Sequence, residues 1–212
     1  MTDDAISQRG LRRTSAMTAV SQDRDHTKIA VKLDPLARRL VGTTHGDMDF
    51  DAPYMTEVAD NLWQGGCVSG LLLPAFIAHV VSLYPWESYE VKHDLASFRE
   101  VRMYDDAMQP LDEVVPALAA WVNHCRETGP TLVHCQAGLN RSGVVVAYAL
   151  MLDGLSADEA IARIRGRRSP AAICNPQFER WLRKSQQLAG HGEDERRTLR
   201  DGQVRTLAGE VP

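Results

Sequence analysis

The residues with the clearest chemical potential stand near the middle of the chain, where His134 and Cys135 are separated by five residues from Arg141 and Ser142. A cysteine thiolate is a strong nucleophile, and a guanidinium can hold two oxygens of one anion. Five intervening residues are enough for a loop whose main-chain N–H groups surround a tetrahedral anion. Gly138 allows the loop a positive φ angle or a close approach that a side chain would obstruct. The pattern predicts nucleophilic attack on a bound anion.

The elements around this loop are expected to hold it in place. The apolar run Thr131–His134 predicts a buried strand, and a helix is expected from Ser142 to Asp153, closed by Gly154. A cysteine between the carboxyl end of a strand and a helix amino terminus lies where N–H groups and the helix dipole attract anions and favour a thiolate. One loop would then supply a nucleophile and an anion site.

Each residue of the loop receives an expected role. Cys135 would attack phosphorus and form a phosphocysteine, Arg141 would bind two phosphoryl oxygens, and Ser142 would donate a hydrogen bond to the sulfur when it leaves. His134 is expected to order the loop rather than to take a proton. The residues expected to bind phosphate are Gln136, Ala137, Gly138, Leu139, Asn140 and Arg141.

The stretch His134–Gly143 resembles the signature loop of the cysteine-dependent protein tyrosine phosphatase superfamily, and its surroundings resemble the dual-specificity branch. The resemblance spans roughly residues 54–185 and includes Ser156–Arg168 and Asn175–Leu182. It implies phosphate monoester hydrolysis without a metal or an organic cofactor. With the alternation of strands and helices along the chain, it implies an α/β fold: a mostly parallel central sheet flanked by helices, with a strand–phosphate-binding loop–helix active site.

The same resemblance implies a general acid that protonates the leaving oxygen, on a loop about thirty residues before the cysteine. Asp105 stands thirty residues before Cys135 and continues the face of Val101 and Met103. We therefore favour Asp105. Asp106 is the alternative if the loop rotates it inward, and its purely structural role would be to cap a turn.

Two departures from the family pattern leave the substrate open. Asn140 stands where dual-specificity relatives usually carry serine, and Ser142-Gly143 resembles the tyrosine-specific branch, whose Trp-Pro-Asp acid loop this sequence lacks. The candidate substrates are a protein carrying phosphotyrosine, phosphoserine or phosphothreonine, a phosphoinositide, and an RNA 5′ phosphate. Pocket depth decides among them.

The remaining elements follow from periodicity and helix signals. Strands are expected at residues 61–66, 76–84 and 100–104, and helices from Leu111 to Cys125, after Ser156 and after Asn175. Residues 1–50 are expected to be a flexible or loosely docked arm, with a short helix near Leu33–Leu40. Residues 51–188 would form the phosphatase domain, and residues 189–212 a polar tail.

Composition narrows the setting. A net charge of −4 gives no reason to expect nucleic acid or a membrane surface as partner, and no segment has the roughly 20 apolar residues needed to span a bilayer. The expected partner is a phosphorylated protein or another phosphate monoester. The cysteines are widely spaced, which favours a reduced, cytoplasmic setting over a disulfide framework or a zinc site; they are Cys67, Cys125, Cys135 and Cys174.

Two other functions compete with hydrolysis. A non-catalytic phosphoprotein-binding module would use the loop for capture alone, and a rhodanese-like sulfurtransferase would use its cysteine for sulfur transfer. Arg141, Ser142 and an upstream aspartate together favour hydrolysis, since binding alone does not need them all. A basic run from Arg163 to Lys184 is either a solvated helix face or a border of the site; Arg168 is its member best matched to the family.

Overall fold

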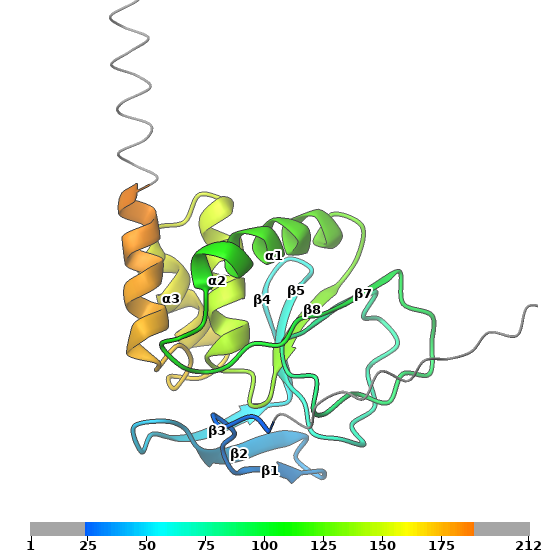
Figure 1. The fold of residues 1–212 in the computed structure, drawn as a ribbon. Helices are drawn as coiled ribbons and strands as arrows, with labels where there is room; N and C mark the ends of the chain where they lie inside the picture. The colour runs from blue at the N-terminus through cyan, green and yellow to red at the C-terminus, as the bar shows by residue number, and fades with distance from the viewer. Residues whose placement is uncertain (1–23, 189–212) are drawn as a thin grey trace, which may run out of the picture.

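The computed structural model describes residues 24–188 and places a five-stranded sheet at the centre of the molecule (Figure 1). Its strand order is β4-β5-β8-β6-β7. Strand β8 is parallel to β5 and β6, β6 is parallel to β7, and only the edge strand β4 is antiparallel to its neighbour. The predicted mostly parallel sheet is confirmed. The strands are β4 (Met55–Ala59), β5 (Leu62–Gly66), β6 (His79–Ser82), β7 (Ser97–Glu100) and β8 (Thr131–Cys135).

Strand β8 is central because its sequence suits burial on both faces. All five of its residues are buried, as expected for a strand covered on both sides in a parallel sheet. Its register with β5 places Cys135 opposite Gly66, at the carboxyl end of both strands. The nucleophile candidate therefore lies at the edge of the sheet where ligands bind in open α/β folds.

The helices pack around α2 (Arg141–Leu152), which lies between α1 (Leu111–Arg126) and α3 (Ala157–Arg167) and contacts β5 and β8. A helix that is apolar on most sides must be buried, and α2 is the most enclosed of the three. Ser156 caps α3 through the predicted capping box with Glu159. A last helix covers residues 176–188, with Asn175 accepting from Gln177 N at 2.9 Å.

The described part of the predicted arm is not loosely docked. Residues 31–53 form a second, antiparallel sheet of three strands, β1 (Val31–Asp34), β2 (Arg39–Thr43) and β3 (Asp49–Pro53), below the main sheet in Figure 1. Its inner face carries Leu40 and Phe50, which belong to the hydrophobic core. Buried and exposed residues alternate in β3 with the two-residue period of a strand. The packing of this sheet against the core was not expected for a polar arm.

The predicted helix near Leu33–Leu40 is wrong. Asp34 does cap main-chain groups, since its Oδ1 accepts from Leu36 N and Ala37 N at 3.0 Å each, but the capped segment is a turn. Arg38 then takes a φ of 54°, which ends any helical path and leads the chain back as β2. An aspartate that accepts main-chain N–H bonds is common at the start of both helices and turns. Asp34 therefore marks a capped segment correctly but does not show that the segment is a helix.

Two smaller differences concern the acid-loop region and α1. The strand predicted at Glu100–Tyr104 is β7 at Ser97–Glu100, although the chain stays attached to the sheet through Val101 N to Ser82 O at 2.8 Å. Pro116 lies inside α1, where it deprives the helix of one main-chain donor. The predicted tail at 189–212 and the first 23 residues lie outside the described range.

Candidate active site

Cys135 is held at the junction of β8 and the loop by main-chain bonds on its own peptide and on its neighbours. Its carbonyl accepts from Cys67 N at 3.0 Å, and the carbonyl of His134 accepts from Leu83 N at 2.9 Å. The Cys135 Sγ lies 3.4 Å from the Ser142 Oγ, close enough for a hydrogen bond to sulfur. The structure thus brings together the sulfur and the hydroxyl that the sequence paired.

The loop is folded so that its N–H groups converge. Gln64 Nε2 donates to the carbonyls of Gly138 at 3.0 Å and Leu139 at 3.4 Å, and Arg168 donates to those of Ala137 at 3.2 Å and Gly138 at 3.1 Å. In a trans peptide the N–H points away from the preceding C=O. Because these carbonyls face outward, the N–H groups that follow them face inward, as an anion site requires.

Gly138 is the residue that makes this fold of the loop possible. Its φ is +70°, and a Cβ at this position would lie 2.3 Å from the carbonyl carbon of Gly65. Both reasons given for a glycine from the sequence, the positive φ and the close approach, apply. Strand β5 and the loop therefore touch backbone to backbone.

Arg168, carried over only from the family pattern, supports the loop from outside. Its side chain is 3% exposed and also donates to the Pro53 carbonyl and to Thr56 Oγ1. Burial lowers the pKa of Arg168 to about 10, and the nearby Tyr89 and Cys135 oppose that shift. The guanidinium stays charged at neutral pH, so it adds positive charge behind the loop.

Arg141 begins α2 and lines the cavity beside Cys135. Its Nη1 donates to the Asp25 carboxylate at 3.0 Å and to the Met103 carbonyl at 3.2 Å, and the group lies 4.9 Å above the Tyr84 ring centroid. Its Nε is buried and has no partner among residues 24–188. Nε and Nη2 form the side-on edge that binds two oxygens of a phosphate. The contacts with Asp25 and Met103 use Nη1 and leave Nε, one atom of that edge, without a partner.

The structure separates the two candidate acids. Asp105 accepts from Asn140 Nδ2 at 2.9 Å and from Asn175 Nδ2 at 2.7 Å, and it lines one small cavity with Cys135 and Arg141. Asp106 points elsewhere: it pairs with His26 Nε2 at 2.7 Å and accepts from Met108 N at 3.0 Å. Asp106 therefore has the turn-capping surroundings named as its structural alternative.

Asn140, the departure from the family pattern, connects the loop to the acid. Besides its bond to Asp105, its Oδ1 accepts from Asn175 N at 3.2 Å. Each carboxylate oxygen of Asp105 therefore accepts a hydrogen bond from one asparagine, Oδ2 from Asn140 and Oδ1 from Asn175. Sequence reasoning placed Asn175 only before the last helix and in a stretch that resembles the family, and no local pattern signals its contact with Asp105.

His134 is fully enclosed between the loop and Tyr89, whose ring meets it edge-on at 5.2 Å between centroids. Burial lowers the pKa of His134 to about 4, and a hydrogen bond with the Cys135 main chain partly offsets that shift. The ring is neutral at physiological pH. It fits a role in ordering the loop.

The cavity above Cys135 measures only about 10 Å³ and is roofed by residues of the arm, Thr27 and Ile29. Cys135 is 2% exposed and Arg141 is 3% exposed. Sequence reasoning did not place Asp25, Thr27 or Ile29 at the site, because they lie in a polar segment without a motif. Their contribution is a finding of the structure.

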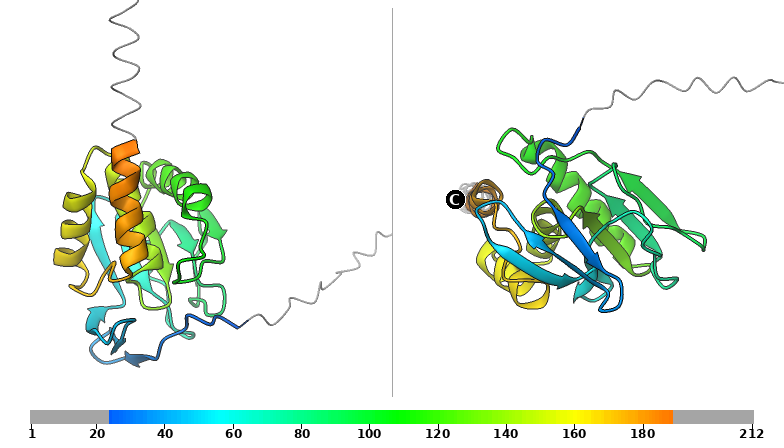
Figure 2. Two further views of the ribbon diagram at one scale, coloured as in Figure 1. Left: turned by 60° about the vertical axis from the view of Figure 1, so that its left-hand side comes forward. Right: turned by 90° about the horizontal axis from the view of Figure 1, so that it is seen from below.

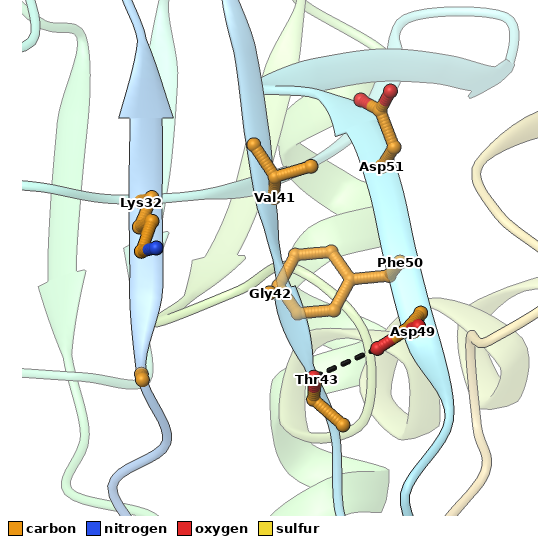
Figure 3. Close-up of a pocket in the computed structure, with 8 residues that line it drawn as sticks. Lys32, Val41, Gly42, Thr43, Asp49, Phe50 and Asp51 are labelled. Atoms are coloured by element: carbon orange, nitrogen blue, oxygen red, sulfur yellow. Dashed lines mark hydrogen bonds between the residues drawn. The ribbon is translucent and has the colours of Figure 1, made fainter.

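A much larger hollow of about 650 Å³ lies over the three-stranded sheet (Figure 3). Lys32, Val41 and Phe50 border it, and Thr43 donates to Asp49 at 2.8 Å along its rim. It contains no cysteine or histidine and lacks the convergent polar groups of the loop. Size alone does not locate the chemistry here, and the small cavity beside Cys135 is the candidate site.

Within the described range, 24–188, no cluster of three or more His, Cys, Asp or Glu side chains is placed to hold a metal ion. None of the helices in that same range has the length and the apolar character needed to cross a membrane. The four cysteines are free: Cys67, Cys125, Cys135 and Cys174.

Comparison with known proteins agrees with this geometry. The family "Dual specificity phosphatase, catalytic domain" matches residues 75–188, which is more than half of the chain. Dual specificity protein phosphatase 15 of Rattus norvegicus is 31% identical over 138 residues, which are 64% of this chain and 54% of the rat protein. Dual specificity protein phosphatase OPG106 of Vaccinia virus is 26% identical over 141 residues, covering 60% of this chain and 80% of the viral protein.

Solved structures show the same fold. Human DUSP28 superposes with a TM-score of 0.57 at 24% identity, over 65% of this chain and 96% of DUSP28. A mouse putative dual specificity phosphatase complexed with zinc tungstate has a TM-score of 0.56 at 26% identity, over 72% of this chain and 96% of its own. The chain spans about half the length of the rat and mouse phosphatase 15 proteins. It belongs to the dual specificity phosphatase catalytic-domain family, within the cysteine-based protein tyrosine phosphatase superfamily.

Proposed function

We propose that this protein hydrolyses phosphate monoesters, chiefly on phosphorylated proteins, through a phosphocysteine intermediate. The observation that carries the proposal is the meeting of Cys135, Arg141 and Asp105 around one cavity at the junction of β8 and α2. A nucleophile, an anion-binding edge and an acid are the three parts that the reaction needs. Cys135 and Arg141 belong to one loop, and Asp105, thirty residues before Cys135, joins them only in the fold.

In the first step, the Cys135 thiolate attacks phosphorus in line and the bond from phosphorus to the ester oxygen breaks. The inward N–H groups of the loop and the free edge of Arg141 hold the phosphoryl oxygens, which carry the charge of the transition state. Asp105 gives its proton to the departing oxygen. Its position beside Cys135 in the same cavity supports its assignment to this transfer.

In the second step, water attacks the phosphocysteine and the bond from phosphorus to sulfur breaks. Asp105, now ionised, takes a proton from the water, and the hydrogen bond of Ser142 stabilises the departing thiolate. Inorganic phosphate leaves and the enzyme returns to its starting state. The step needs no redox partner, since no atom changes oxidation state.

The relatives support a phosphoprotein substrate by their names, and the mouse relative solved with zinc tungstate carries a tetrahedral oxyanion of the same shape as phosphate. Free cysteines fit the expected cytoplasmic setting. Activity on phosphotyrosine and on phosphoserine or phosphothreonine belongs to the same proposal.

The decisive experiment measures release of phosphate from p-nitrophenyl phosphate and from phosphopeptides in the presence of EDTA. We expect turnover in the wild type, inhibition by tungstate, and loss of turnover in Cys135→Ser with tungstate binding retained, since the anion site survives. Cys125→Ser, on the buried face of α1, is the matched control and should keep turnover. Persistent turnover in Cys135→Ser contradicts the proposal.

The same preparations test the competing functions. A phosphoprotein-binding module would bind tungstate and phosphopeptides. It would release no phosphate from p-nitrophenyl phosphate or from phosphopeptides, in the wild type or in any variant. A rhodanese-like sulfurtransferase would form thiocyanate from thiosulfate and cyanide. We expect no thiocyanate, because a guanidinium and a carboxyl group beside Cys135 suit the binding of an oxyanion and the protonation of a leaving oxygen, which sulfur transfer does not require.

A further inference from the structure

The segment from Asp25 to Ile29 lies outside the family match at 75–188, yet it contacts the candidate active site at several points. In the view from below (Figure 2, right), this dark blue segment crosses the end of the domain before it enters β1. Its contacts are made with the loop, with the arginine and with the acid segment. A segment that merely passed over the site would not need three distinct attachments.

The first attachment is a buried ion pair. Asp25 Oδ2 accepts from Arg141 Nη1 at 3.0 Å, and the side chains of Asp25 and Arg141 are 1% and 3% exposed. The carboxylate occupies the Nη1 side of the guanidinium, so it does not take the place of a phosphoryl oxygen on the Nε edge. Asp25 therefore fixes the plane of the guanidinium and leaves its binding edge open.

The second attachment links Asp25 to the acid segment. Asp25 Oδ1 accepts from Thr27 N at 2.8 Å and from Thr27 Oγ1 at 2.6 Å, and Thr27 Oγ1 in turn accepts from Asp105 N at 3.0 Å. One carboxylate thus bonds to Arg141 directly and to the backbone of Asp105 through a single side chain. The two groups on either side of the scissile bond share this support.

The third attachment secures the segment to the loop. The side-chain amide of Gln136 donates to the Ile29 carbonyl at 2.8 Å and accepts from Ile29 N at 3.1 Å. This exchange of two hydrogen bonds resembles the one between backbone groups of antiparallel strands. On the other side, His26 pairs with Asp106 and stacks on Tyr104 at 5.0 Å between ring centroids. The segment is therefore attached at Asp25 and His26 at one end and at Ile29 at the other, with Thr27 between them.

We infer that Asp25 is a positioning residue of this enzyme: it orients the Arg141 guanidinium for the phosphoryl group and, through Thr27, sets the place of Asp105. The inference rests on the proposed function. A carboxylate that only stabilised the fold would be needed for folding but not for the alignment of the reacting groups. A carboxylate that only blocked the site would slow the enzyme, and its removal would raise activity.

The test compares Asp25→Asn with wild type in the full chain. Loss of the charge should lower kcat/KM for p-nitrophenyl phosphate on the order of 10²-fold, the scale of a misplacement of about 1 Å in a reacting group. We expect kcat to fall and the inhibition constant of tungstate to rise, because both depend on Arg141. Asp25→Glu should restore part of it. Asp47→Asn, an exposed aspartate in the turn between β2 and β3, is the matched control and should behave as wild type.

A double-mutant cycle separates positioning from simple destabilisation. Arg141→Lys removes the two-oxygen edge, so adding Asp25→Asn to that variant should cost little further activity if Asp25 acts through Arg141. Thermal unfolding of each variant identifies the fraction folded, to which the rates are normalised. Unchanged kinetics in Asp25→Asn, a rise in activity, or a full additive loss in the Arg141→Lys background overturns the inference.

The outcome stays distinct from that of the proposed function. If wild type shows no turnover that depends on Cys135, hydrolysis is wrong, yet tungstate affinity still tests the orientation of Arg141. In that case Asp25→Asn in the Cys135→Ser protein should weaken tungstate binding, measured by calorimetry. Equal affinity with and without the Asp25 charge contradicts the positioning role whatever the reaction.

Discussion

Asp105 and Asp106 are neighbours in sequence with opposite surroundings. The side chain of Asp105 is 9% exposed, contacts two asparagine amides and borders the cavity of Cys135, whereas that of Asp106 is 23% exposed and pairs with His26. The fold turns one carboxyl group toward the cavity of Cys135 and the other toward His26. In the proposed reaction, the first is the one assigned to exchange a proton with a bound ester.

We predict that Asp105→Asn lowers kcat for a phosphoserine peptide on the order of 10²-fold or more, the usual contribution of a general acid. The loss should be smaller for p-nitrophenyl phosphate, because p-nitrophenolate leaves readily without a proton. Asp106→Asn keeps its hydrogen-bonding shape and should stay close to wild type. Steady-state kinetics on both substrates check the prediction, and equal losses in the two variants contradict it.

At the scale of elements, the site is the meeting place of two sheets. A Cβ at Gly66 would lie 2.5 Å from Leu40 Cδ1 and 2.6 Å from the Ala137 carbonyl carbon, so β2, β5 and the loop are in close contact at this point. Interiors are packed as densely as organic crystals, and a shift in one of these elements moves the others. The small sheet is thus part of the structure that shapes the loop.

We predict that Leu40→Ala lowers the free energy of unfolding by about 2–5 kcal/mol, the range for a buried leucine that leaves a cavity. It should also reduce turnover, because the cavity opens beneath the loop. Leu36→Ala is the control: Leu36 is 96% exposed while Leu40 is 0% exposed. Urea unfolding measures both variants, and an equal, small effect of the two substitutions would show that the small sheet is not docked on the core.

At the scale of the whole molecule, the buried His134 couples folding to pH. Its pKa is about 4 in the folded protein, below the ordinary value of 6.5, because burial disfavours the charged ring. Between these two values the unfolded chain binds a proton that the folded chain does not. Stability from this group is therefore fully present above pH 6.5 and is lost as the pH falls toward 4.

We predict that the difference between the pKa of His134 in the folded and in the unfolded chain removes roughly 3 kcal/mol of stability between neutral pH and about pH 4. His134→Asn, which cannot be protonated, should show a shallower fall over that window, although it is less stable at neutral pH. His124→Gln, with an exposed side chain, should follow the wild-type curve. Urea titrations across the pH range provide the measurement, and parallel curves for wild type and His134→Asn would refute the assignment.

The sequence by itself determined the local chemistry of this protein. The apolar run ending at Cys135, the glycine in the loop and the opening of α2 form a continuous segment, so their geometry follows from strand, turn and helix preferences acting over a few residues. The α/β architecture followed from the alternation of elements. The thirty-residue spacing that the family resemblance implies, together with the apolar alternation before Asp105, led to the aspartate that lines the cavity.

Only the tertiary structure decided which distant groups support that chemistry. Asp25 meets Arg141 across 116 positions of sequence, and Asn175 meets Asp105 across 70. A helix cap, a turn aspartate and a polar arm carry the same local signals whether or not they reach an active site. Their partners are set by the packing of two sheets and a terminal helix, which no short pattern encodes, because a side chain's partner in space depends on the path of the whole chain.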